Sequence, residues 1–203
     1  MENYNIIFPE SRGLFVSQLS DADNSVNSFL AEEQKQGRRL AYSKVFLSDI
    51  RNQYAELTAS SLYTNVLSQA PCSIVGQSPL NGCKTAVLVK TTDLDESLTF
   101  HSMRLTEEEA FQHSSYLQTL SLFNKYIDYL KENNLDMSTH LVRTWIYITD
   151  IDVNYNGVVK ARNDIFRQYG LTADTHYVAS TGIGGDSQSG HACVAIDFLT
   201  YPD

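Results

Sequence analysis

The feature that most constrains the fold is an internal repeat that spans much of the chain. The segment Leu40–Tyr54 (LAYSKVFLSDIRNQY) aligns without a gap with Leu141–Tyr155 (LVRTWIYITDIDVNY), so that an aspartate and a tyrosine coincide in the two copies. Farther along, Cys72–Val87 aligns with Ser180–Ala195, and the first glycine of the one falls on a glycine of the other. A repeat of this length indicates one supersecondary unit that occurs twice.

A boundary between the two copies is expected in the polar stretch Thr92–Glu96. Two units over residues 1–92 and 97–203 would each have about 100 residues, which is an ordinary domain size. The helix predicted in the first unit, Ser25–Gln36, is shorter and more polar than the corresponding helix of the second. We therefore interpret the first unit as a degenerate copy.

Charge argues against two classes of partner. The 203 residues carry a formal net charge of −9 at pH 7, so the chain repels nucleic-acid phosphates and anionic membrane surfaces. The longest basic cluster, Lys35–Arg39, is short and is interpreted as a solvated surface. No apolar run reaches the roughly 20 residues of a membrane span, and the sequence starts without a signal-peptide pattern. We expect a cytoplasmic protein that binds neither nucleic acid nor membrane.

The three cysteines, Cys72, Cys83 and Cys193, are odd in number and widely spaced. This spacing argues against a disulfide framework and offers no paired-thiol motif for zinc. His191 and Cys193 alternate near the last predicted strand, but a metal site would need a third ligand at a recognisable spacing. We expect free thiols, no metal and no cofactor.

A long helix is predicted to begin at Thr106 in the second unit. Thr106 and Glu109 have the spacing of a capping box, and the acidic residues between them complement the positive end of a helix dipole. Apolar residues at three- and four-residue steps then predict one buried stripe, formed by Leu117, Leu120, Phe123, Ile127 and Leu130. The pattern ends at Asn133.

The segment Leu141–Ile151 is predicted to be a strand because β-branched and aromatic residues dominate it. Alternate residues of a strand point to opposite faces. One face, expected to pack under the helix, has Val142, Thr144, Ile146 and Ile148. The other face has Arg143, Trp145, Tyr147 and Thr149, a composition unlike that of an ordinary core.

The remainder of the second unit is predicted to contain a helix and a last strand. The helix covers Tyr155–Tyr169 and is closed by Gly170. A glycine-bearing turn over Ser180–Gly185 precedes a strand over Cys193–Tyr201. Each unit is therefore predicted to be α+β, in the order β-α-β-α-β, with helices on one face of its sheet.

These elements resemble the YjgF/RidA (endoribonuclease L-PSP-like) family. The strongest stretch is Gln112–Val159, in which a helix leads into a strand that ends in a Thr-Asp pair. The resemblance implies a chorismate-mutase-like α+β fold, trimers with ligand clefts between subunits, and hydrolysis of enamine or imine intermediates to 2-oxo acids. Family members are often called translation initiation inhibitors. A weaker resemblance to chorismatases, also two-repeat proteins, implies hydrolysis of chorismate.

The resemblance also implies site residues, several of which this chain lacks. Active family members hold the substrate carboxylate with an arginine, whose position falls on Cys72 in the first unit and on Ala179 in the second. The glutamate that positions water falls near Val87 in the first unit. Because valine cannot act as a base, ordinary imine deaminase activity is not expected. Asp197 is the nearest acidic residue on the last strand of the second unit.

Three functional hypotheses follow. The leading one is binding of a small carboxylate-bearing metabolite by a catalytically altered protein. The candidate ligand contacts are Arg143, Trp145, Tyr147, Ser180, Thr181 and Cys72, although Cys72 also suits a buried thiol. The second is a hydrolase or lyase acting on an imine or a chorismate-like acid, with Asp197 placing water. The third is an assembly scaffold that pairs with other copies of the chain or with an additional C-terminal repeat.

Overall fold

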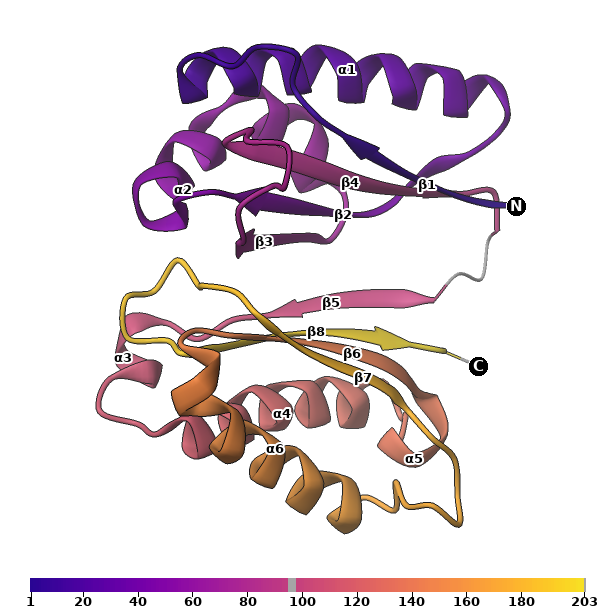
Figure 1. Ribbon diagram of the computed structural model, residues 1–203. Helices are drawn as coiled ribbons and strands as arrows, with labels where there is room; N and C mark the ends of the chain where they lie inside the picture. The colour runs from indigo at the N-terminus through magenta and orange to yellow at the C-terminus, as the bar shows by residue number, and fades with distance from the viewer. Residues whose placement is uncertain (95–97, 203) are drawn as a thin grey trace. The chain divides into compact units, whose positions relative to one another are not determined.

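The chain divides into two compact units, which cover residues 1–97 and 98–203 of a computed structural model (Figure 1). The structure describes residues 1–94 and 98–202, so the predicted linker at residues 92–96 lies partly outside them. Each unit contains one four-stranded sheet and its own hydrophobic core. None of the described helices is long and apolar enough to cross a membrane.

The first unit is a mixed sheet covered on one face by helices (Figure 1). Its strands run in the order β1-β4-β2-β3, and only β2 and β3 are parallel neighbours. The elements are β1 (Glu2–Ile7), α1 (Phe15–Lys35), β2 (Arg39–Leu47), α2 (Ile50–Ala59), two short turns of π and 3₁₀ helix (Leu62–Val66 and Leu67–Gln69), β3 (Cys72–Gly76) and β4 (Thr85–Thr92).

The second unit repeats this topology. Its strands run in the order β5-β8-β6-β7, again with one parallel pair, β6 and β7. The elements are β5 (Thr99–Met103), α3 (Glu107–Ala110), α4 (Ser115–Glu132), α5 (Met137–His140), β6 (Leu141–Ile148), α6 (Ile151–Gln168), β7 (Ala179–Gly184) and β8 (Val194–Thr200). The predicted α+β class, with helices on one face of each sheet, is confirmed.

A matching irregularity strengthens the equivalence of the two units. In the first, the register between β2 and β4 shifts between Leu40 and Tyr42; in the second, the register between β6 and β8 shifts between Leu141 and Arg143. These are the same positions in the repeat alignment. The extra residue of the second shift, Val142, is 38% exposed, so its predicted place under the helices is wrong, because a bulge interrupts the alternation of faces.

Aromatic packing joins helix α4 to the second sheet. The Phe123 ring meets Phe166 of α6 and Phe198 of β8 edge-to-face, with ring centres 5.8 and 5.3 Å apart. Tyr126 stacks on Phe198 at 4.1 Å and exchanges a hydrogen bond with Thr200. Most of the predicted apolar stripe therefore faces the core, but its first member, Leu117, is 45% exposed.

The prediction of a single long helix from Thr106 is wrong. The capping box caps the N-terminus of the short helix α3, which ends at Ala110. The chain then leaves the helical conformation at Gln112, whose φ of 57° is left-handed. Helix α4 starts afresh, with the Ser114 side chain accepting a hydrogen bond from the Leu117 backbone N–H. The predicted end at Asn133 is confirmed as its C-cap.

Two other helices begin earlier than predicted. Helix α1 starts at Phe15 rather than Ser25, and its buried Gln18 accepts a hydrogen bond from the Lys84 backbone N–H at 2.7 Å. A polar residue with a partner this distant in sequence gives no local helix signal. Helix α6 starts at Ile151 rather than Tyr155 and ends, as predicted, just before Gly170.

The segment Ser180–Gly185, predicted to be a turn, is mostly strand β7. It pairs in parallel with β6, from Arg143 opposite Ala179 to Ile148 opposite Gly184. Glycine and serine favour turns locally, but here the neighbouring strand imposes an extended backbone. The predicted order β-α-β-α-β therefore omits strand β7, since the second unit has two strands after helix α6 where one was predicted.

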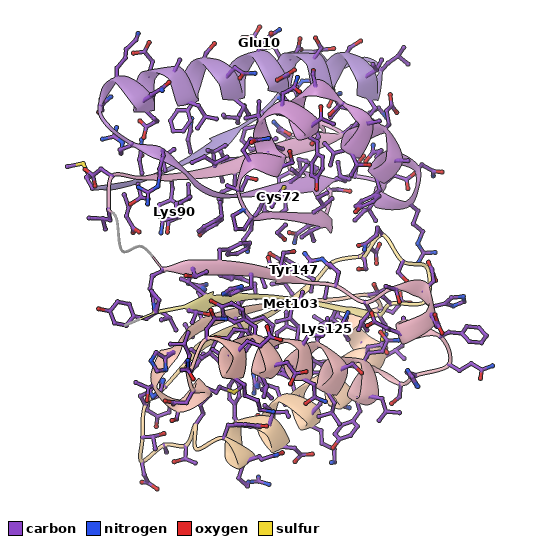
Figure 2. All side chains as sticks on the ribbon, turned by 180° about the vertical axis from the view of Figure 1, so that it is seen from behind. Glu10, Cys72, Lys90, Met103, Lys125 and Tyr147 are labelled. Atoms are coloured by element: carbon purple, nitrogen blue, oxygen red, sulfur yellow. The ribbon has the colours of Figure 1, made fainter. Side chains whose placement is uncertain are left out.

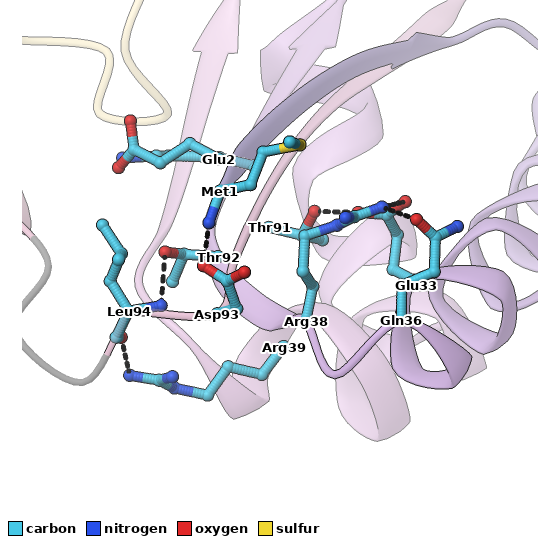
Figure 3. Close-up of polar contacts among 11 residues, drawn as sticks. Met1, Glu2, Glu33, Gln36, Arg38, Arg39, Thr91, Thr92, Asp93 and Leu94 are labelled. Carbon is cyan, nitrogen blue, oxygen red and sulfur yellow. Dashed lines mark hydrogen bonds and ion pairs between the residues drawn. The ribbon is translucent and has the colours of Figure 1, made fainter.

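A buried ion pair fastens helix α1 to the first sheet. Glu33, 3% exposed, accepts hydrogen bonds from Arg38 Nε and Nη2 at 2.6 and 2.7 Å and one from the Thr91 hydroxyl (Figure 3). These hydrogen bonds lower the pKa of Glu33 to about 2, with Arg38 making the larger contribution and Thr91 the smaller. Because this pKa lies below that of an unfolded glutamate, its stabilisation is present above about pH 4.3 and is lost toward pH 2.

Glu33→Gln should lower the melting temperature of the first unit by roughly 5 °C or more, because Arg38 would keep its buried position without a carboxylate. Calorimetry at pH 7 would measure this, and the variant should also lose part of the acid dependence between pH 4.3 and 2. Glu32→Gln is the matched control, since the Glu32–Lys35 pair is solvent-exposed. Equal melting temperatures for the two variants would contradict the assignment.

Candidate functional site

The second sheet has one face turned away from helices α4 and α6, which we call the site face. Ile146 and Ile148 of β6 join the core on the helical side, so Arg143, Trp145 and Tyr147 lie on the site face, as their alternation predicted. Figure 2 shows Tyr147 on the sheet of the second unit and Lys125 on its helices. The strand registers bring Thr181 of β7 and Asp197 of β8 beside Trp145.

Arg143 has hydrogen-bonding capacity that the described residues leave unused. Its Nη2 makes one long hydrogen bond, 3.4 Å, to the Thr181 hydroxyl. Its Nε is buried and makes no hydrogen bond within the described part of the chain. The guanidinium lies over the Trp145 ring, 4.7 Å from its centre, which holds the charged group at the sheet by a cation–π contact.

Asp197 is the centre of a polar network on the same face. It is fully buried, accepts a hydrogen bond from the Tyr147 hydroxyl at 3.1 Å on one oxygen, and pairs with Arg104 at 3.0 Å on the other. Arg104 was missed by the sequence analysis because it lies between a strand and a helix cap, where no periodic pattern marks it. Since both oxygens of Asp197 have partners, the network orients the carboxylate rigidly.

The structure does not bring Ser180 and Thr181 together on one face of the sheet, although the sequence placed both in a single turn. They are successive residues of β7 and so point to opposite faces of the sheet. Thr181 meets Arg143 on the site face, whereas Ser180 accepts a hydrogen bond from Thr144 at 2.9 Å on the helical side. Of the two, only Thr181 belongs to the site face.

Neither Cys72 nor Cys193 belongs to the site face of the second sheet. Cys72 begins β3 of the first unit, is partly buried, and packs against that unit's core on its helical side. Cys193 lies just before β8, where burial raises the pKa of its thiol. His191, its predicted neighbour on one strand face, instead packs its ring against Phe111. Across residues 1–94 and 98–202, no three His, Cys, Asp or Glu side chains converge as a metal site would need.

The equivalent face of the first unit is built differently. Tyr42 occupies the position that Arg143 has in the second unit. The buried cation is Lys90 of β4, which Figure 2 labels. Its Nζ lies 2.5 Å from a Glu2 carboxylate oxygen and 5.5 and 5.6 Å from the ring centres of Tyr4 and Tyr42. Because Lys90 already has a carboxylate partner, the first unit offers less for an incoming acid than the second.

The chain is similar to known proteins in fold rather than in sequence. No protein-family model and no curated protein match the chain. Among solved structures, a chorismatase is similar over 99% of this chain and 54% of its own, with 12% identity and a TM-score of 0.51. The chain thus spans about half the length of that protein.

Two smaller solved structures are also similar. One is described as a putative translation initiation inhibitor from Salmonella typhimurium, with 11% identity, a TM-score of 0.40, and coverage of 50% of this chain and 79% of its own. The other is a YjgF-family member from Neisseria meningitidis, with 16% identity, a TM-score of 0.41, and coverage of 55% and 82%. The likeness to chorismatase confirms the predicted resemblance as one of fold.

Proposed function

We propose that the second unit binds a small carboxylate-bearing metabolite on its site face, with Arg143 as the main ligand contact. The observation that carries this proposal is the buried Arg143 Nε without a hydrogen-bond partner among the described residues. A buried donor left unsatisfied costs about 1–3 kcal/mol. A carboxylate bound by Nε and Nη2 would remove that cost through two parallel charge-assisted hydrogen bonds.

The strand register supports the same role. The family resemblance puts the carboxylate-binding arginine at Ala179, and Ala179 is the residue directly opposite Arg143 in the β6–β7 pairing. The small alanine side chain leaves room on the site face beside Arg143. A guanidinium supplied from the neighbouring strand would therefore reach nearly the same region that an arginine at Ala179 would reach.

The rings around Arg143 favour an acid with a planar body. Trp145 lies beneath the guanidinium, and the Phe100 ring of β5 is 6.1 Å from the Trp145 ring. Flat apolar groups stack well on such rings. Cyclic and aromatic acids are therefore expected to bind more tightly than aliphatic 2-oxo acids of similar charge.

The test is a fluorescence titration, because Trp145 is the only tryptophan of the chain and contacts Arg143. The panel contains pyruvate, 2-oxobutyrate, benzoate, 4-hydroxybenzoate and chorismate. We expect a saturable change with at least one acid, weakened about 10- to 100-fold in Arg143→Ala and only partly restored in Arg143→Lys, because lysine cannot form a bidentate pair.

Arg167→Ala is the matched control, because Arg167 is an exposed arginine of the same unit. It should leave the titration unchanged. Silence of Trp145 across the panel in a folded protein would count against the proposal. That outcome, together with a mass above that of the monomer in light scattering, would favour the third hypothesis, in which the chain pairs with other copies or with an additional repeat.

A hydrolase is the second candidate, supported by the oriented Asp197 carboxylate and by a fold similar to that of a chorismatase. In this case Asp197 would hold a water molecule while Arg143 holds the substrate carboxylate. Product formation from chorismate or from an enamine, lost in Asp197→Asn but with ligand binding retained, would support it. Binding without turnover of any panel member would leave only the binding function.

A further inference from the structure

The second unit has a groove on its helical side, away from the site face. It lies between helix α6, the segment 171–178 and strand β7, and has a volume of about 380 Å³. Its apolar walls are Phe166, Leu171 and Val178. The groove combines these apolar side chains with polar ones, a mixture that suits a small ligand with both an apolar and a polar part.

The charged group of the groove is Arg162 of helix α6, which is half-buried. Its guanidinium lies 5.9 Å from the Phe166 ring centre, and its Nη1 is 3.4 Å from the Ser180 hydroxyl oxygen. Its Nε and Nη2 donate hydrogen bonds to the neutral amide oxygen of Asn163, at 3.2 and 2.9 Å.

The carboxylate nearest in sequence does not neutralise this arginine. Asp164 pairs instead with Lys160 at 2.9 Å and Arg167 at 3.9 Å, and accepts a hydrogen bond from Tyr116. Arg162 makes no ion pair within residues 1–94 and 98–202. A half-buried guanidinium that has no carboxylate partner among the described residues can accept an anion as its charged partner.

The opposite wall supplies hydrogen-bonding groups and a ring. The Ser180 hydroxyl and the His176 imidazole border the groove, and the His176 ring is positioned by a contact of 3.5 Å between its Nε2 and the Leu141 carbonyl oxygen. Tyr177, 83% exposed, stands at the rim. Exposed tyrosines with an apolar ring and a polar tip are common at binding surfaces.

We propose that this groove is a second anion site, which binds a carboxylate or phosphate group carried on a compact apolar ring. Arg162 and Ser180 would hold the oxyanion, and Phe166 and Val178 would cover the ring. Because Ser180 and Thr181 point to opposite faces of β7, this site is separate from that of Arg143, and either can exist without the other.

The experiment is an amide NMR titration of the full chain with benzoate, phenyl phosphate and inorganic phosphate. Benzoate or phenyl phosphate should cause saturable shifts at His176, Tyr177 and Ser180, and Arg162→Met should weaken this binding about 10- to 100-fold. Methionine keeps the packing on Phe166 while it removes the charge. Arg143→Ala and the exposed Arg167→Ala should leave these shifts unchanged.

Each arm of the titration decides one part of the proposal. Absence of saturable shifts with both ring acids, or binding that persists in Arg162→Met, would overturn it. Inorganic phosphate bound as tightly as phenyl phosphate would overturn the assignment of an apolar ring. Partial recovery in Arg162→Lys would support the role of charge and would show that loss in Arg162→Met is not a folding defect.

Discussion

Asp197→Ala is expected to lower the free energy of unfolding of the second unit by about 3–5 kcal/mol, because it removes one partner of the buried Arg104–Asp197 ion pair. The Tyr147 hydroxyl would lose its acceptor at the same time. Urea denaturation followed by the emission of Trp145 measures this unit specifically, since the chain has no other tryptophan. A loss below about 1 kcal/mol would show that the pair contributes little.

A double variant tests whether the lost stability comes from removing only one charge of the Arg104–Asp197 pair. Arg104→Met combined with Asp197→Leu replaces both charges with apolar side chains of similar length, and should recover most of the stability lost by the single change. The stability of the Asp197 variants also decides how the activity test is interpreted. If Asp197→Asn abolishes turnover, a catalytic role of Asp197 follows only if the variant unfolds at the same urea concentration as the parent protein.

The second unit should also lose stability between about pH 6.5 and pH 4 because of one histidine. His101 of β5 lies against the rings of Tyr126 and Tyr129, with ring centres 5.9 and 4.1 Å away, and its buried Nε2 makes no hydrogen bond within the described residues. Burial lowers the pKa of His101 to about 4. The unfolded chain, with a histidine pKa of about 6.5, therefore takes up this proton first as the pH falls.

A pKa difference of this size would lower the free energy of unfolding by about 3 kcal/mol for a fully buried histidine. His101 is partly exposed, so we expect a loss of about 1–2 kcal/mol. His101→Phe should remove the dependence in this pH range while it preserves the aromatic packing. Urea midpoints measured through Trp145 at pH 7, 5.5 and 4 would test this. The same slope in parent and variant would assign the effect to another group.

Much of the second unit could be predicted from local patterns. The two faces of β6 follow from strict alternation after the bulge, so Arg143, Trp145 and Tyr147 could be placed on one face without the structure. The end of α6 follows from Gly170, whose φ of 76° suits a residue without a side chain. These features depend on residues close together in the chain.

What could not be predicted depends on contacts between distant residues. Strand β7 has a turn-like composition and is extended because β6 lies beside it. Arg104 gains its role from Asp197, which is 93 residues away in sequence. Likewise, Ser180 and Thr181 look like one motif in the sequence, and only their pairing in a sheet separates them.

The strand order has a further consequence for how each unit forms. The last strand of each unit is not at the edge of its sheet: β4 lies between β1 and β2, and β8 lies between β5 and β6 (Figure 1). Until that strand is synthesised, the first strand of the unit has no neighbour in the sheet. The parallel pair of each sheet, β2 with β3 or β6 with β7, can form earlier, but the first strand joins only after the last strand is available, through the long-range pairing that makes folding slow. A nascent chain that has not yet reached Val194 would carry a finished first unit and a second whose sheet is still open.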